Sequence, residues 1–143
     1  MSPREYFSLS EEMRHQISQK EERAATLRRL ATSLAPRLAR DVRVQTSPGP
    51  DRMQTLMEEA MDEELAAAAL RDSHAEMLLR ITLAISSLPD PRMTRLLELR
   101  YLEGSPWSAV VSAMHQSRSV VLHLHRLSLD LLPDFPDPVI PRL

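Results

Sequence analysis

The chain has 143 residues with a formal net charge of -2; 43% of them are apolar, 3% are aromatic and none is cysteine. The lack of cysteine excludes disulfides, thiolate metal sites and a cysteine nucleophile, and the length suits one ordinary domain or a long helical element with a small domain. No signal segment or run of about 20 apolar residues is visible, so we expect a cytoplasmic protein without membrane contact. The helical periodicity of its apolar residues predicts an all-α fold.

The charge is divided unevenly along the sequence. Residues 51–87 carry three Lys/Arg and eight Asp/Glu, whereas residues 88–132 carry five and four. Strong binding to nucleic-acid phosphates requires clustered basic side chains. The near-neutral segment 88–132 therefore predicts weak phosphate binding from a single copy.

The first predicted helix spans residues 3–34. Its apolar positions recur at spacings of three, four or seven residues, and Lys20 is the one polar interruption. These positions are Tyr6, Met13, Ile17, Ala24, Leu27, Ala31 and Leu34. The helix is expected to stop near Pro36. A loop over residues 35–50 follows, and Ser47-Pro48-Gly49-Pro50 has the composition of a turn.

The second predicted helix begins with Asp51 as its N-cap and extends to about Ser87. A heptad seam of apolar residues runs along this helix and is interrupted only by Glu63 and His74. We expect His74 to be partly exposed. The seam residues are Met53, Leu56, Ala60, Ala67, Leu70, Met77, Ile81, Ala84 and Leu88. A seam this long requires a partner helix. Residues 1–87 therefore predict a long antiparallel, coiled-coil-like hairpin and dimerisation element, which closes within one chain or across two copies.

Residues 88–132 predict three short helices. Asp90 is placed as an N-cap with Pro91 behind it, and this helix runs to about Glu103, where Gly104 ends it. The next helix begins after Ser105-Pro106. A break at His115-Gln116 leads to Ser117, the expected N-cap of the last helix, whose predicted packing residues are Val121, Leu124, Ser128, Leu129 and Leu132. The proline-rich residues 133–143 should form an extended tail.

These helices contain the run Leu96-Leu97-Glu98-Leu99-Arg100-Tyr101, a glycine turn, and then Val110, Met114, Ser117, Arg118 and Val121. Together they resemble region 4 of bacterial sigma-70 factors, the helix-turn-helix that reads the -35 promoter element. With Trp107, His115 and His125 the chain is still more similar to a family of small prophage-encoded proteins, classed as transcriptional regulators, in which a helical hairpin precedes such a module.

The resemblance implies that residues 117–126 form the recognition helix. Ser117 caps it, Trp107, Val110, Met114, Val121, Leu124 and Leu129 pack, and the implied DNA-binding residues are Ser117, Arg118, Ser119, Leu122, His123 and Arg126. Sigma recognition helices usually carry an acidic residue at position 119 and basic residues at 120 and 122, where this chain has Ser119, Val120 and Leu122. Serine and leucine can contact bases but neutralise no phosphate.

Other side chains that could carry chemistry have simpler interpretations. His123 and His125 are two residues apart on a helix and point about 200° away from each other, so a zinc site with His115 is not expected. His125 is expected to pack or cap. The acidic pairs and triplets at Glu58-Glu59 and Asp62-Glu63-Glu64 fit a solvated helix face. We predict no enzyme, no cofactor and no metal.

The predicted organisation is a hairpin over 1–87, a DNA-binding helix-turn-helix over 88–132 and a tail over 133–143. The predicted function is transcription regulation of the phage or prophage type, with double-stranded DNA as one partner and a second copy or another helical protein bound through residues 1–87. The alternative is a coiled-coil adaptor or structural protein with a weak or vestigial DNA-binding module. RNA polymerase is a further candidate partner.

Overall fold

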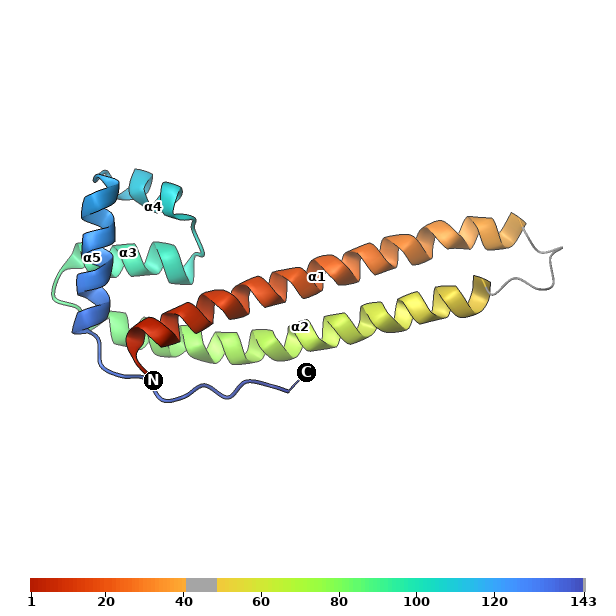
Figure 1. The fold of residues 1–143 in the computed structure, drawn as a ribbon, viewed down its shortest axis with the longest axis horizontal. Helices are drawn as coiled ribbons and strands as arrows, with labels where there is room; N and C mark the ends of the chain where they lie inside the picture. Colours follow the sequence, from red (N-terminus) through yellow and green to blue (C-terminus); the bar gives the residue numbers. More distant parts are fainter. Residues whose placement is uncertain (41–48, 143) are drawn as a thin grey trace. The chain divides into compact units, whose positions relative to one another are not determined.

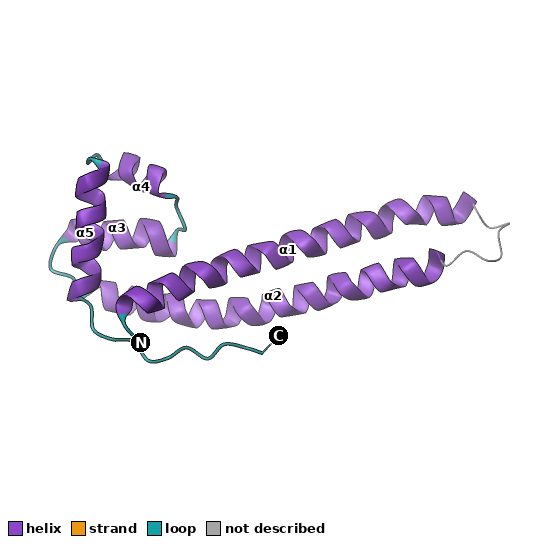
Figure 2. Cartoon of the chain, viewed as in Figure 1, coloured by secondary structure: helices purple, strands orange, loops and turns teal. Residues whose placement is uncertain are grey.

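The computed structural model describes residues 1–40 and 49–142, which fold into helices joined by loops, without a strand (Figure 2). The prediction of an all-α fold is confirmed. Along the chain lie α1 (Pro3–Arg40), α2 (Gly49–Ile85), α3 (Pro91–Leu97), the π-helix η1 (Glu98–Leu102), α4 (Trp107–Met114) and α5 (Arg118–Leu131) (Figure 1). None of these helices is long and apolar enough to cross a membrane.

The described residues divide into two compact units, and α1 and α2 take part in both. The first unit contains Met1–Arg14 and Asp72–Ile140, and the second contains the described residues of 15–71 with Pro141 and Arg142. The predicted segments 1–87, 88–132 and 133–143 stay predictions.

In the second unit, α1 and α2 pair through the predicted apolar positions. Ile17, Ala24, Leu27 and Ala31 of α1 are buried, as are Ala60, Ala67 and Leu70 of α2. Ion pairs flank this seam and show that the helices run antiparallel, because residues late in α1 meet residues early in α2. Arg28 Nη2 lies 2.8 Å from Glu64 Oε2, and Arg71 Nε lies 3.2 Å from Glu21 Oε1.

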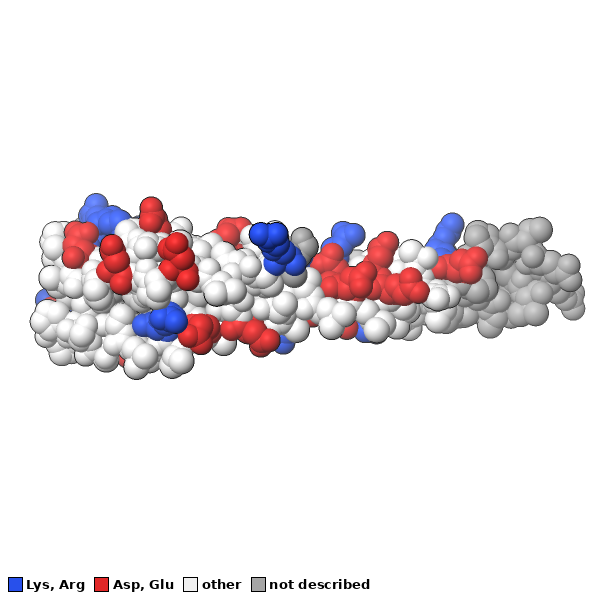
Figure 3. All heavy atoms as spheres, turned by 90° about the horizontal axis from the view of Figure 1, so that it is seen from below, with Lys and Arg blue, Asp and Glu red and all other residues white. Residues whose placement is uncertain are grey.

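The acidic residues of α2 do not form one uniform solvated face, so that prediction was partly wrong. Glu63 lies 3.2 Å from Arg23 Nε and 3.7 Å from Lys20 Nζ, and Glu64 pairs with Arg28. The carboxylates of Glu63 and Glu64 therefore lie beside the contact between α1 and α2. Figure 3 shows acidic side chains gathered along α2, where Glu58, Glu59 and Asp62 are exposed.

The ends of both long helices differ from the prediction. α1 continues through Pro36 to Arg40, because a proline removes a single amide donor and need not end a helix. α2 begins at Gly49 rather than behind a cap at Asp51; Pro50 fits a first helical turn, and Asp51 lies within that turn. The remaining part of the predicted loop, residues 41–48, lies outside the described residues.

In the first unit, the start of α1 and the end of α2 pack with aromatic and aliphatic side chains. Tyr6, Phe7, Met77 and Ile81 are buried, and so is Ser10, which the sequence pattern did not reveal. His74 is 7% exposed, so the prediction of a partly exposed histidine was wrong. Its Nε2 lies 3.2 Å from Ser10 Oγ, and this partner explains why an imidazole is accepted on the buried seam.

The C-terminal tail is not helical, but Phe135 anchors it. The Phe135 ring is 6% exposed and stacks on Tyr6, with 4.3 Å between ring centroids. Its backbone amide donates to the Met1 carbonyl at 2.9 Å. The sequence predicts an extended tail but gives no sign of this anchor, because a single aromatic residue among prolines has no periodic pattern.

Candidate nucleic-acid interface

The connection between α4 and α5 fixes where α5 begins. His115 is the C-cap of α4, and its left-handed backbone φ of 54° turns the chain sharply. Ser117 then caps α5, its hydroxyl accepting a hydrogen bond from the Val120 amide at 3.3 Å. The predicted break and the predicted cap are both confirmed.

One side of α5 packs and another faces solvent. Val121, Leu124, Ser128 and Leu129 are buried, as predicted, and α5 runs across α3, against which it packs (Figure 1). Val110 of α4 is also fully buried, whereas Trp107 and Met114 are half-buried.

The residues implied in DNA contact lie on the first two and a half turns of α5 and at its cap. Ser117, Arg118, Ser119, His123 and Arg126 are exposed. Leu122 is half-buried, because it precedes the buried Leu129 by two helical turns and shares its side of the helix. The exposed members that lie within α5 itself form a polar surface, which we call the α5 polar face: Arg118, Ser119, His123 and Arg126.

The arginines of residues 88–132 fall into two groups. Arg92 pairs with Asp90 at 3.0 Å, Arg95 with Glu103 at 3.8 Å, and Arg100 with Glu11 at 2.7 Å. Within the described part of the chain, Arg118 and Arg126 have neither a carboxylate partner nor a hydrogen bond. The two unpaired cations of this segment therefore both lie on the α5 polar face.

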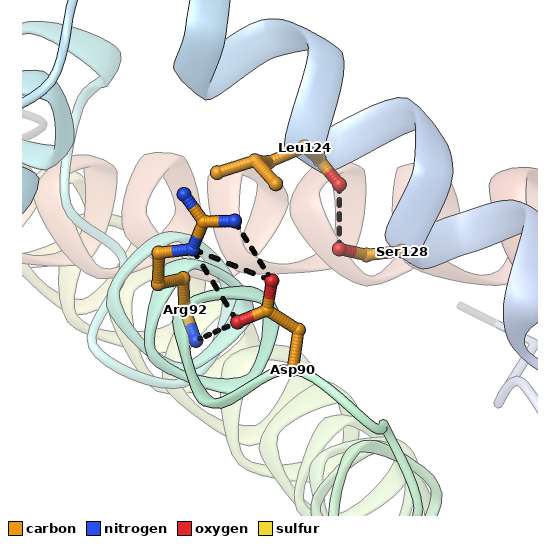
Figure 4. A network of polar contacts seen from close by, with 4 residues as sticks. All are labelled: Asp90, Arg92, Leu124 and Ser128. Atoms are coloured by element: carbon orange, nitrogen blue, oxygen red, sulfur yellow. Dashed lines mark hydrogen bonds and ion pairs between the residues drawn. The ribbon is translucent and has the colours of Figure 1, made fainter.

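Local hydrogen bonds hold the helices that support this face (Figure 4). At the start of α3, Asp90 accepts a hydrogen bond from the Arg92 amide at 2.9 Å, which confirms its predicted role as N-cap. Hydrogen bonds from the Arg92 side chain lower the pKa of the Asp90 carboxyl. On the buried side of α5, the Ser128 hydroxyl donates to the Leu124 carbonyl at 2.6 Å, which satisfies a polar group in the core.

His125 joins the back of α5 to η1 and α4. Its Nε2 lies 2.6 Å from the Tyr101 hydroxyl, and its ring meets Trp107 edge to face at 4.9 Å. Burial, assisted by the charges of Arg100, Arg4 and Arg126, lowers the pKa of His125 to about 4, while burial raises the pKa of Tyr101. His125 is therefore neutral near pH 7 and packs, as predicted.

Two side chains of α1 contact η1. Arg14 Nη2 donates to the Tyr101 carbonyl at 2.7 Å, and Glu11 pairs with Arg100, whose guanidinium lies over the Trp107 ring at 4.7 Å. Gly104 follows η1 with a φ of 71°, which confirms the predicted glycine stop. The π-helix, Glu11 and Arg14 were not predicted, because sequence periodicity gives no signal for contacts with a segment about ninety residues away.

The three histidines considered as metal ligands serve different local roles. His115 ends α4, His123 lies on the α5 polar face, and His125 contacts Tyr101. Among residues 1–40 and 49–142, no three His, Asp or Glu side chains are grouped as a metal would need.

No protein-family model, curated protein or solved structure matches this chain.

Proposed function

We propose that the chain is a DNA-binding transcriptional regulator of the phage or prophage type. In this proposal α1 and α2 form a helical hairpin, and α3 to α5 form a sigma region 4-like helix-turn-helix whose residues 117–126 enter the major groove. The observation that carries the proposal is the pairing of the arginines. Three are neutralised by carboxylates, and the two left unpaired in the described segment share the α5 polar face.

The chemistry of this face suits a duplex. Arg118 lies in the first turn of α5 and would contact a guanine edge or a phosphate, while Arg126, about 12 Å further along the helix, would contact the phosphate backbone. Ser119 and His123 offer hydrogen bonds to base edges, and the exposed part of Leu122 suits a thymine methyl group. Two cations give a modest electrostatic contribution, so binding should be tightest at low salt.

A gel-shift series with the full chain tests this proposal. We expect the protein to retard fragments of its own upstream genomic DNA at low salt, and to bind at least one of them more tightly than an unrelated fragment of equal length. The proposal is wrong if the protein retains its helical circular-dichroism spectrum and retards none of these fragments.

A second candidate function is supported by the other exposed side of α5. Val120, Leu127 and Leu131 are 38%, 39% and 56% exposed and lie within about 40° of one another around the helix. Such an apolar side suits an adaptor that binds protein, and RNA polymerase is the partner suggested by the resemblance to sigma region 4. Polymerase that co-purifies with the wild type but not with Leu127→Asp, together with an absence of DNA binding, would favour the adaptor.

A further inference from the structure

A pocket of about 290 Å³ lies between α2 and the C-terminal tail, and we call it the Tyr6 pocket. Side chains from residues 72–80 of α2 and 137–139 of the tail line it, together with Tyr6 of α1 (Figure 1). Every lining residue belongs to the first compact unit. A cavity of this volume is close to the lower end of the range for small-molecule sites, so it suits a ligand of few atoms.

The Tyr6 hydroxyl gives this pocket a polar group that the fold leaves unsatisfied. It is buried and has no hydrogen-bond partner among the residues that the structure describes, although buried polar groups ordinarily have one. The ring stacks on Phe135, which fixes its direction. Burial raises the pKa of Tyr6, and the charges of Arg80 and Glu76 have smaller effects of opposite sign, so the hydroxyl lies near these two lining side chains. The unpartnered hydroxyl is therefore directed into the Tyr6 pocket.

The charged side chains around the pocket leave one carboxylate without a counter-ion. The lining contains three carboxylates, those of Asp72, Glu76 and Asp137, and one guanidinium, that of Arg80. Glu76 lies 3.4 Å from Arg80 Nε, and Asp137 lies 3.5 Å from the Met1 amino group. Asp72 has neither an ion pair nor a hydrogen bond with any residue that the structure describes. The pocket therefore combines an excess of negative charge with a free hydrogen-bonding group.

These two properties define the class of ligand. An anion would be repelled by the excess negative charge. A metal ion does not fit, because no three of the described acidic or histidine side chains are grouped as a metal would need. An ammonium group fits both properties, since it is positively charged and carries three N–H donors. Met77, which lines the pocket and is 1% exposed, adds an apolar floor for a short hydrocarbon chain.

We propose that the Tyr6 pocket binds a small organic amine, which pairs with the Asp72 carboxylate and forms a hydrogen bond with the Tyr6 hydroxyl. Titration of the isotope-labelled full chain with butylamine, followed by amide chemical shifts, tests this without DNA and so separately from the proposed function. We expect a saturable change around Tyr6 and at residues 72–80 and 137–139. Butanol and butyrate are matched probes without the positive charge, and each should bind about threefold or more weakly.

Two variants test the assigned groups. Asp72→Asn and Tyr6→Phe should each raise the dissociation constant for butylamine about threefold or more, because each removes one of the polar partners. Tyr6→Phe should also leave the free energy of unfolding unchanged or raise it, since it removes a buried hydroxyl that has no partner. The matched control is Asp62→Asn, which removes an exposed, unpaired carboxylate of the same helix outside the pocket and should leave the dissociation constant unchanged.

Several results would overturn the proposal. These are the absence of a saturable shift at the lining residues with butylamine, or binding of butanol as tight as that of butylamine. Unchanged binding in both variants, with circular dichroism as helical as that of the wild type, would also overturn it. A Tyr6→Phe chain that unfolds more easily than the wild type would show that the hydroxyl is satisfied within the fold, and would contradict its role in the pocket.

Discussion

Two arginines differ from the others of residues 88–132 only in their surroundings. The side chains of Arg92, Arg95 and Arg100 each have a carboxylate nearby, whereas Arg118 and Arg126 have none in the described structure. From the sequence alone all five count equally toward a near-neutral segment. Among the described residues of 88–132, both arginines without a carboxylate partner lie on α5.

His125 provides a test of the packing behind that helix. Its pKa is about 4 in the folded chain against an ordinary value of 6.5, so between these values the unfolded chain binds more protons than the folded one. The free energy of unfolding should therefore fall as the pH is lowered from about 6.5 to 4, by at most about 3 kcal/mol from this residue. Urea titrations at several pH values measure it.

His125→Gln should flatten this pH profile, and the matched variant His123→Gln, at an exposed position on the same helix, should not. Some dependence should remain in the His125 variant, because burial also lowers the pKa of His74. Identical profiles for the wild type and His125→Gln would contradict the role given to His125.

Among the elements, the helix ends that depend on neighbouring residues were predicted from the sequence, and the contacts with distant segments were not. Asp90, Gly104 and Ser117 were identified as helix ends because each acts on amides or dihedral angles of its immediate neighbours. The π-helix η1 was missed because it ends where Arg14 of α1 donates to the carbonyls of Tyr101 and Leu102. That contact depends on tertiary packing.

Gly104 should therefore be sensitive to substitution. An added Cβ would lie 2.7 Å from Arg14 Nη1, and a φ of 71° is strained for any residue with a side chain. We expect Gly104→Ala to lower the free energy of unfolding by about 1–2 kcal/mol in urea denaturation. Ser105→Ala, at the next position, should change it little; an equal loss in both variants would contradict the account.

The tail is held through one residue that the sequence pattern did not indicate. Phe135 stacks on Tyr6 and meets Phe7 edge to face with 5.8 Å between centroids. Phe135→Ala should cost about 3 kcal/mol of stability, as for other large-to-small changes in a core, while Pro136→Ala at an exposed position should cost little. A loss below about 0.5 kcal/mol for Phe135→Ala, the size of an ordinary surface change, would show that the tail does not contribute to the core.

For the whole chain, the apolar periodicity predicted the seam between α1 and α2 but not the two compact units. Ala60, Ala67, Leu70, Met77 and Ile81 are buried as the heptad pattern indicates. The first residues of α1 belong to one unit with residues 72–140 because Glu11, Arg14 and Phe7 contact η1.

The sequence predicted where α5 lies in the chain, but not which of its side chains are buried or paired. The cap at Ser117 predicted where α5 begins, and that start is confirmed, whereas the assignment of residues 117–126 as a recognition helix came from the resemblance and stays a prediction. The half-burial of Leu122 depends on how α5 packs, and the availability of Arg118 and Arg126 depends on where the carboxylates of other elements lie. Neither property follows from the order of residues alone.

The proposed DNA binding depends on Arg118 and Arg126, and one comparison tests this dependence most directly. The affinity of the full chain for its upstream DNA should be measured over a range of salt concentrations for Arg118→Ala/Arg126→Ala and for Arg92→Ala/Arg95→Ala, which remove the same charge. We predict that the first variant binds about tenfold or more weakly, with a logarithmic salt slope shallower by about one for each phosphate that is no longer neutralised, while the second stays within about twofold of the wild type. Equal reductions of affinity in the two variants, or none in the first, would contradict the account.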